Sequence, residues 1–128
     1  MDDIIEQVKF NDDGLVTAIA QSDESGEVLM LAYMNADTLR QTLETGQMTY
    51  WSRSRQEVWV KGKTSGNTQQ VKEVRLDCDG DALLFLIEQK GGAACHKGYR
   101  SCFYRSVENG ELKARGERVF DPDEVYGS

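Results

Sequence analysis

ALLFLIE, residues 82–88, is the stretch that decides the fold, because its first six residues are apolar without interruption. A run of this length suits a β-strand and falls far short of the roughly 20 apolar residues that a membrane helix requires. Its nearly continuous apolar character predicts a strand at the centre of a sheet. The segment before it, residues 70–78, also predicts a strand, with Val74, Leu76 and Cys78 on one face. We therefore expect a sheet built around residues 82–88.

Further strands lie on both sides of this segment. Residues 15–21 and 27–34 are apolar and flank SDESG at 22–26, which is a turn-rich hairpin signal. Asn109-Gly110 is a dipeptide typical of a two-residue turn after another strand. The strands that the sequence predicts are 15–21, 27–34, 48–52, 58–60, 70–78, 82–88 and 102–107.

One helix is clearly indicated. Asn35 can cap a helix over residues 36–45, because its side chain can accept from the first free amides of the helix. Leu39 and Leu43 fall on one helical face at i, i+4, and Gly46 stands where a helix end favours glycine. The strands and this helix predict an α+β fold, a mainly antiparallel sheet with one clear helix.

Length and composition indicate a single domain over residues 1–128. With 39% hydrophobic and 29% charged residues, the chain has the composition of a globular protein. A net charge of -7 argues against a general nucleic-acid binder, which needs a basic surface. The N-terminus, MDDIIEQVKF, has neither the basic start nor the apolar segment of a signal peptide. We therefore expect a cytoplasmic protein without a membrane segment.

Three aspartates are crowded together at Asp77, Asp79 and Asp81. Their carboxylates repel one another unless a cation lies among them, and hard oxygen ligands suit Mg²⁺ or Ca²⁺. An EF-hand is rejected because Ala82 stands where its loop needs glycine. If the preceding strand continues through Asp79, Asp77 and Asp79 point to one face and Cys78 to the other. A solvated acidic turn between two strands is the alternative, and the residues alone leave both open.

The cysteines form a second set, at Cys78, Cys95 and Cys102. No C-x2-C pair is present, so the pattern is not that of a zinc finger. An odd number of cysteines in a cytosolic chain favours metal ligation or a reactive thiol over disulfides. Three thiolates could hold Zn²⁺ and leave a fourth position for water, as catalytic zinc sites do; the alternative is three small core residues. His96, the single histidine, follows Cys95 directly, so it is a neighbour of such a metal or simply a packing residue.

Basic residues gather in two short stretches that also carry hydroxyls, amides and glycines. Such groups together can bind phosphate oxygens, so the two stretches indicate a phosphate site. Each residue alone could instead belong to a solvated strand face. The candidate substrate-binding residues are Arg53, Arg55, Lys61, Lys63, Ser65, Asn67, Lys97 and Arg100.

Six runs of the chain together resemble the phosphoribosyl-AMP cyclohydrolase family. They are VLMLAYMNADTL (28–39), TGQMTYWSRSR (45–55), KGKTSGNTQ (61–69), RLDCDGDALL (75–84), AACHKGYRSCFYR (93–105) and FDPDEVYG (120–127). The runs follow one another in family order through residues 10–127, and the DCD and ACH…RSCF segments are highly specific. In some relatives a phosphoribosyl-ATP pyrophosphatase domain follows on the same chain. Because this chain ends at Ser128, we expect the monofunctional form.

The resemblance also implies the cofactors and the assembly. It implies one zinc ion per subunit on Cys78, Cys95 and Cys102, and one Mg²⁺ per subunit on Asp77, Asp79 and Asp81. It implies an intertwined homodimer in which Cys78 reaches the zinc of the partner chain. The alternation of faces deduced above for Cys78 and its neighbouring aspartates is compatible with this division.

The reaction that the resemblance implies is hydrolysis of the N1–C6 bond in the adenine ring of 1-(5-phosphoribosyl)-AMP. The product is the ProFAR formimino-carboxamide intermediate of the third step of L-histidine biosynthesis. Zinc supplies hydroxide at neutral pH, but three thiolates leave the site negatively charged and weaken this effect, so a base is needed and His96 is the candidate proton shuttle. A metal-stabilised binding module without chemistry is one rival. A nucleoside deaminase is another, disfavoured because its H-x-E and P-C-x-x-C signatures are missing.

Overall fold

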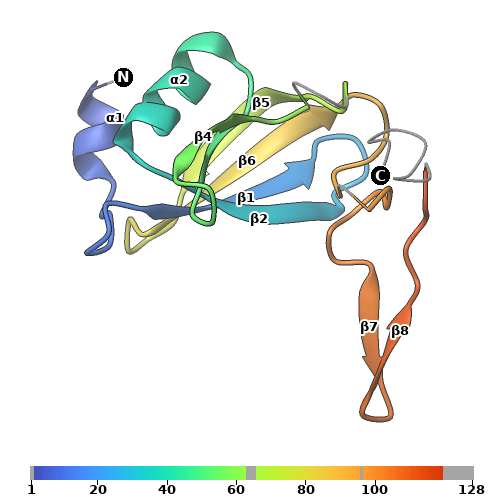
Figure 1. The fold of residues 1–128 in the computed structure, drawn as a ribbon. Helices are drawn as coiled ribbons and strands as arrows, with labels where there is room; N and C mark the ends of the chain where they lie inside the picture. Colours follow the sequence, from blue (N-terminus) through green and yellow to red (C-terminus); the bar gives the residue numbers. More distant parts are fainter. Residues whose placement is uncertain (1, 63–65, 96, 120–128) are drawn as a thin grey trace.

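A computed structural model describes residues 2–62, 66–95 and 97–119 of the chain. The described part holds two helices and eight strands (Figure 1). In chain order they are α1 (Asp2–Gln7), β1 (Val16–Ser22), β2 (Val28–Met34), α2 (Ala36–Thr45), β3 (Thr49–Ser52), β4 (Glu57–Val60), β5 (Gln69–Leu76), β6 (Ala82–Gln89), β7 (Arg105–Glu108) and β8 (Glu111–Ala114). None of the helices in these residues is long and apolar enough to cross a membrane.

The main sheet has the strand order β2-β1-β6-β5. Its outer pairs, β1–β2 and β5–β6, are antiparallel, whereas β1 and β6 run parallel. β6 lies between β1 and β5, which confirms the central position expected for residues 82–88. Two further antiparallel pairs, β3–β4 and β7–β8, complete the described strands. The α+β, mainly antiparallel fold expected from the sequence is confirmed.

One face of the sheet and the helix α2 enclose the hydrophobic core. Leu83, Phe85 and Ile87 of β6 are buried in alternation, because successive strand residues point to opposite faces. Leu39 of α2 and Tyr50 of β3 complete the packing and are both fully buried. Figure 1 shows α1 and α2 lying together on one side of the sheet.

Helix α2 has the ends that the sequence predicts. Asn35 Oδ1 accepts from the Thr38 amide at 2.8 Å, and Thr38 Oγ1 accepts from the Asn35 amide at 2.9 Å, which forms a capping box. Gly46 ends the helix with a left-handed φ of 75°, and its N–H donates to the Thr42 carbonyl. The expectation of one helix was incomplete, because α1 also forms. Its six residues are too few to show a helical period in the sequence.

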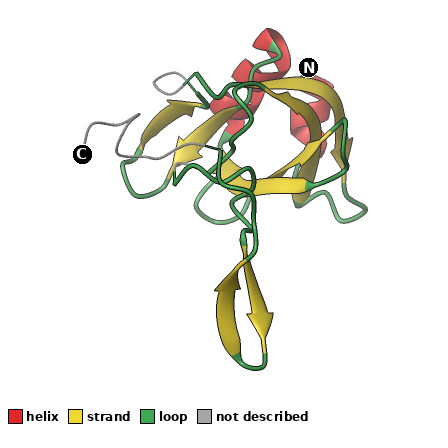
Figure 2. Cartoon of the chain, turned by 90° about the vertical axis from the view of Figure 1, so that its right-hand side faces the viewer, coloured by secondary structure: helices red, strands yellow, loops and turns green. Residues whose placement is uncertain are grey.

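The β7–β8 hairpin extends away from the body as an arm (Figure 2). Asn109 and Gly110 form its turn with φ values of 53° and 80°, as the Asn-Gly signal predicts. Val107 and Leu112 pair across the two strands and are 76% and 60% exposed. β7 begins at Arg105 instead of the expected residue 102, because the Cys102 amide instead donates to the Leu29 carbonyl of β2.

The connection between β5 and β6 is a turn that begins earlier than the sequence suggested. β5 ends at Leu76, so the strand does not continue through Asp79 and the alternation of faces does not apply to Cys78. Asp77 Oδ1 accepts from the amides of Asp81 and Ala82 at 3.0 and 3.3 Å, which replaces strand pairing with a local turn.

Candidate active site

Two of the three cysteines meet in the segment between β6 and β7. The amide of Cys95 donates to the Tyr99 carbonyl, and the amide of Gly98 donates back to the Cys95 carbonyl at 2.9 Å, so Cys95 sits at a tight turn. The Cys102 amide is fixed to Leu29 of β2 at 2.6 Å. The thiols of Cys95 and Cys102 lie close enough for Cys95 to influence the pKa of Cys102, and the Lys97 amide donates to Cys95 Sγ at 3.4 Å. The turn and the anchor on β2 thus bring two soft donors together.

The surroundings of Cys102 disfavour a free thiolate. Cys102 as a whole is exposed to solvent, but its thiol is partly buried and interacts with the charges of Cys95 and Lys61. Burial and then the negative charge of Cys95 raise the pKa of Cys102 to about 11, against the opposing effect of Lys61. A bound divalent ion would reverse this balance, because it deprotonates coordinating thiols. The donor chemistry therefore fits Zn²⁺, with two soft donors from one chain at this position.

Lys61 lies inside the protein beside this pair. It is only 5% exposed, and its Nζ donates to the carbonyl of Ala94, the residue before Cys95. Burial lowers the pKa of Lys61, while the charges of Cys102 and Cys95 raise it. The sequence placed Lys61 among the phosphate-binding candidates, but the structure places it against the backbone that carries Cys95.

A chain of buried hydrogen bonds supports the same region. The Tyr50 hydroxyl donates to Gln69 Oε1 at 2.7 Å, and Gln69 Nε2 donates to Gln89 Oε1 at 2.8 Å. Burial, with a smaller effect of the Cys102 charge, raises the pKa of Tyr50 well above its ordinary value. The sequence analysis missed these three residues, because polar side chains inside strands give no distinctive pattern.

Cys78 lies at the opposite end of the sheet from the thiol pair. The Cys102 amide is bonded to Leu29 of β2. The residue before Leu29 pairs with Gln21 of β1, and Gln21 pairs with Leu86 of β6, so Cys102 lies at the level of Leu86 in the sheet. Cys78 precedes Ala82, and the stretch from Ala82 to Leu86 alone spans about 13 Å at about 3.3 Å per residue. Zinc–sulfur bonds are about 2.3 Å long, so this separation argues against Cys78 of the same chain as a ligand of a metal at the thiol pair.

The three aspartates do come together. Ligand oxygens of Asp77, Asp79 and Asp81 all lie within 4.8 Å of one another, and all three residues are exposed. The hydrogen bond that the Asp81 carboxyl donates to Asp77, and then the negative charge of Asp77, raise the pKa of Asp81. Such crowding is relieved by a hard cation, so the donor set fits Mg²⁺.

An aromatic cavity of about 500 Å³ opens between β2 and the β3–β4 hairpin. The Arg53 guanidinium lies 4.0 Å from the centroid of the Tyr33 ring at this cavity. Trp59, another wall residue, lies 5.2 Å from Lys61 Nζ, which connects the cavity to the thiol pair. The lining residues are Leu31, Ala32, Tyr33, Trp51, Ser52, Arg53, Ser54 and Trp59. The sequence indicated Arg53 as a candidate for substrate binding. It gave no sign of Tyr33 and Trp59, which come together at the cavity only after folding.

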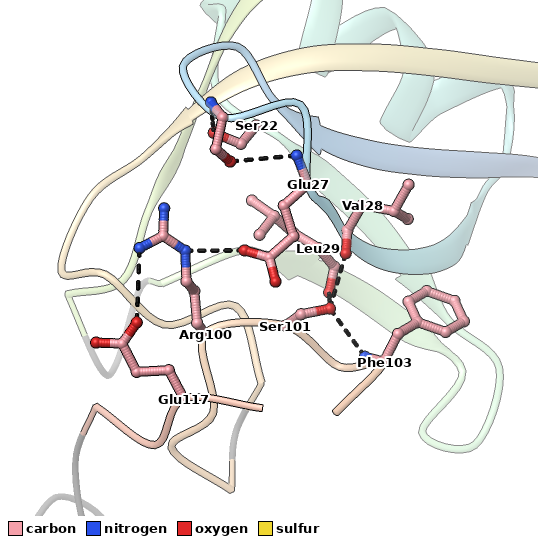
Figure 3. Close-up of polar contacts among 9 residues, drawn as sticks. Ser22, Glu27, Val28, Leu29, Arg100, Ser101, Phe103 and Glu117 are labelled. Atoms are coloured by element: carbon pink, nitrogen blue, oxygen red, sulfur yellow. Dashed lines mark hydrogen bonds and ion pairs between the residues drawn. The ribbon is translucent and has the colours of Figure 1, made fainter. Parts of the chain in front are cut away.

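Arg100 is engaged with acidic side chains. Its Nε donates to Glu27 at 2.9 Å and its Nη1 lies 3.9 Å from Glu117 (Figure 3). Next to it, Ser101 Oγ donates to the Val28 carbonyl at 2.7 Å and accepts from the Phe103 amide, as the same view shows. These contacts fasten the Cys102 segment to β2, so Arg100 has a structural task at this position.

The other described substrate-binding candidates do not gather at this cavity. Arg55 lies 3.9 Å from Glu57 with both side chains exposed, and Lys97 is exposed. Asn67 is buried, and its carbonyl accepts from Gln89 Nε2 at 3.0 Å. Lys63, Ser65 and His96 lie outside the described residues. Among the described candidates, Arg53 is therefore the one that lines the aromatic cavity.

Comparison with known proteins identifies the family. The family model described as Phosphoribosyl-AMP cyclohydrolase matches residues 30–104, which contain the cysteines, the aspartates and all the residues that line the cavity. A Phosphoribosyl-AMP cyclohydrolase of Salinibacter ruber is 59% identical over 125 residues, covering 98% of both chains. One of Desulfatibacillum aliphaticivorans is 63% identical over 88% of this chain and 90% of its own. One of Methanothermobacter thermautotrophicus is 58% identical over 92% of this chain and 86% of its own. The chain belongs to the phosphoribosyl-AMP cyclohydrolase family.

Proposed function

We propose that the chain hydrolyses the N1–C6 bond of the adenine ring in 1-(5-phosphoribosyl)-AMP and forms the ProFAR formimino-carboxamide. Family membership makes it a hydrolase of histidine biosynthesis. The observation that carries the detailed proposal is the paired thiols of Cys95 and Cys102 next to the aromatic cavity. We assign the activity to one domain of residues 1–128 acting in the cytoplasm, where free thiols stay reduced.

Residues of the chain would hold a zinc ion at the thiol pair. Cys95 and Cys102 would bind it from one protomer and Cys78 from its partner, because Cys78 is too far away within one chain. A zinc ion held by these residues would lower the pKa of water, so that hydroxide would be available at neutral pH. His96, next to Cys95 in sequence, would take the proton from water and deliver one to N1 of the ring.

The aromatic cavity would bind the nucleotide. Tyr33, Trp51 and Trp59 offer ring faces for stacking, which suits a purine. Arg53 is kept at the cavity by its contact with Tyr33 and has the planar cation that pairs with phosphate oxygens. Ser52 and Ser54, which also line the cavity, add hydroxyls. Of the remaining described candidates, Arg55, Asn67, Lys97 and Arg100 would contribute only if the bound substrate reorders their side chains, and Lys63 and Ser65 remain candidates from the sequence.

The acidic cluster would hold Mg²⁺. Asp77, Asp79 and Asp81 supply three close carboxylates at an exposed turn, which leaves room for waters or a substrate phosphate. Because Cys78 lies in the same turn, a cation at this position would also stiffen the segment that presents Cys78 to the partner.

A homodimer follows from the same reasoning. The β7–β8 arm exposes Val107 and Leu112, and Phe103 near its base is 61% exposed. Apolar side chains in a projecting hairpin gain free energy when a second chain covers them. An intertwined dimer would bury the arm and bring the partner's turn to the thiol pair.

Turnover of the substrate is the direct test. Purified protein is loaded with Zn²⁺ and Mg²⁺ and incubated with 1-(5-phosphoribosyl)-AMP, while the ultraviolet spectrum reports ring opening. We expect a spectral change that requires both metals and disappears in Arg53→Ala at low substrate concentration. Zinc-loaded protein that binds the nucleotide but leaves the ring closed would instead identify a binding module.

A further inference from the structure

Lys61 is a buried cation whose position the reaction described above does not explain. Lysine is almost never buried without a partner, because an ammonium loses much of its hydration inside a protein. At 5% exposure, Lys61 is as enclosed as many core residues. Its backbone amide donates to the Met48 carbonyl at 3.1 Å, which fixes the start of the side chain at the end of β4. A defined interaction must therefore balance the charge at its other end.

The contacts of the Nζ atom point to the thiol pair. Nζ donates to the carbonyl of Ala94, and the Ala94 amide in turn donates to the Arg100 carbonyl, so the residue before Cys95 is held on both sides. Both Cys102 and Cys95 lie close enough to interact with the charge of Lys61. The Trp59 ring, 5.2 Å away, covers the ammonium on another side. The cation thus contacts the backbone of the residue before Cys95, and its charge interacts with both thiol residues.

We propose that Lys61 is a positioning residue of the metal centre, which holds the Cys95 backbone through Ala94 and balances the negative charge of the thiolates. This inference rests on the metal site proposed above and adds a fourth participant to it. Three thiolates around a divalent ion carry a net negative charge, and a fixed ammonium beside the sulfurs brings the whole centre close to neutral. Neighbours of this kind commonly set metal affinity and the electronic properties of the bound ion.

The role differs in a measurable way from phosphate binding. A lysine that binds the substrate phosphate affects KM and leaves the metal untouched. A lysine that balances the thiolates changes metal affinity in the absence of substrate, and it lowers kcat more than it raises KM. These readouts separate the two roles within one set of variants.

The test uses Lys61→Met and Lys61→Gln in the full chain. Methionine keeps the length of the side chain without its charge, and glutamine also keeps a donor for the Ala94 carbonyl. We expect zinc affinity, measured by competition with a chromophoric chelator, to fall about 10- to 100-fold in both variants. Lys61→Arg, which keeps the charge, should recover most of this loss. Lys72→Met is the matched control, since Lys72 is exposed and pairs with Glu88 at 3.5 Å, and its zinc affinity should equal that of the unchanged protein.

Cobalt substitution gives a second readout that packing alone would not change. The sulfur-to-cobalt absorption should keep its intensity in Lys61→Gln, because the thiolates remain, but move to longer wavelength as the sulfurs lose a neighbouring cation. Should Lys61→Met fail to fold, Lys61→Gln and Lys61→Arg carry the comparison. Unchanged affinity and an unchanged cobalt band in folded Lys61→Gln would overturn this inference alone. An unchanged protein that binds no zinc would overturn both this inference and the proposed metal site.

Discussion

Mixing two inactive variants would reveal which chain supplies each zinc ligand. Cys78→Ser and Cys95→Ser should each lose zinc and activity, because a neutral hydroxyl is a much weaker ligand for zinc than a thiolate. The sheet separates Cys78 from the Cys95 and Cys102 pair by more than about 10 Å within a protomer, counted along β6 at about 3.3 Å per residue. If the site is shared, a hybrid dimer collects both defects in one site and neither defect in the other.

The expected recovery follows from the two-fold symmetry. Equal amounts of the two variants with free subunit exchange give about half of the dimers as hybrids, each with one intact site, so about a quarter of the unchanged activity should return. Zinc content should recover in the same proportion. Differently tagged subunits and native mass spectrometry measure the hybrid fraction, and the ultraviolet assay measures turnover.

A matched mixture provides the control. Cys95→Ser mixed with Cys102→Ser should restore nothing, because these two ligands come from the same protomer and every site then lacks one of them. If the Cys78→Ser and Cys95→Ser mixture showed no activity although hybrid dimers had formed, the prediction of a shared site would be wrong. Recovery in the control mixture would show that Cys95 and Cys102 serve different sites.

Four further predictions address the remaining groups. Chelation that spares zinc should abolish activity, Mg²⁺ should restore it, and Asp79→Asn should need more Mg²⁺ for the same recovery. If Asp79→Asn reached the wild-type rate without added Mg²⁺, the acidic cluster would be a solvated turn without a metal. His96→Ala should keep zinc but lower kcat about 10²–10⁴-fold, and intact metal with intact kcat would end the proton-shuttle hypothesis. Tyr50→Phe should lower the free energy of unfolding by about 1–3 kcal/mol in urea titrations, because Gln69 Oε1 stays buried without its donor; an unchanged midpoint would contradict this. Because the pKa of Cys102 is raised to about 11, its thiol is protonated at neutral pH in the metal-free protein, so zinc must displace the proton and zinc affinity should fall as the pH is lowered. Calorimetry in buffers of different ionisation enthalpy measures these protons, and an affinity independent of pH would refute the reasoning.

The parts of the fold that depend on local sequence were predicted well. The helix α2 ends where Asn35 and Gly46 indicate, since capping and left-handed backbone are decided by neighbouring residues. The Asn109-Gly110 turn and the central strand β6 were predicted for the same reason. The start of β7 was not, because it depends on the bond between Cys102 and a strand far away in sequence.

The site divides in a similar way. The aspartate cluster was predictable because its members lie within one short turn. The burial of Lys61 was not, since a lysine next to glycine in sequence gives no sign of Ala94 across the fold. The pairing of Arg100 with Glu27 was equally hidden, as was the gathering of aromatic rings from separate strands. Contacts between distant residues decide these features, and residue type alone does not report them.

The parallel pairing of β1 with β6 has a consequence for the order in which the protein folds. Thr17 lies opposite Ala82, so one edge of β1 stays open during synthesis until most of the chain has been made. The β1–β2 hairpin can form early from neighbouring residues, but loop closure over such a distance is slow and leaves a strand edge exposed. Cys95 and Cys102 come after β6 in the chain, and the amide of Cys102 is anchored on Leu29 of β2. The segment that carries the two thiols can therefore reach its place only after β6 has been made, so we expect zinc uptake at the proposed site to be a late event in folding.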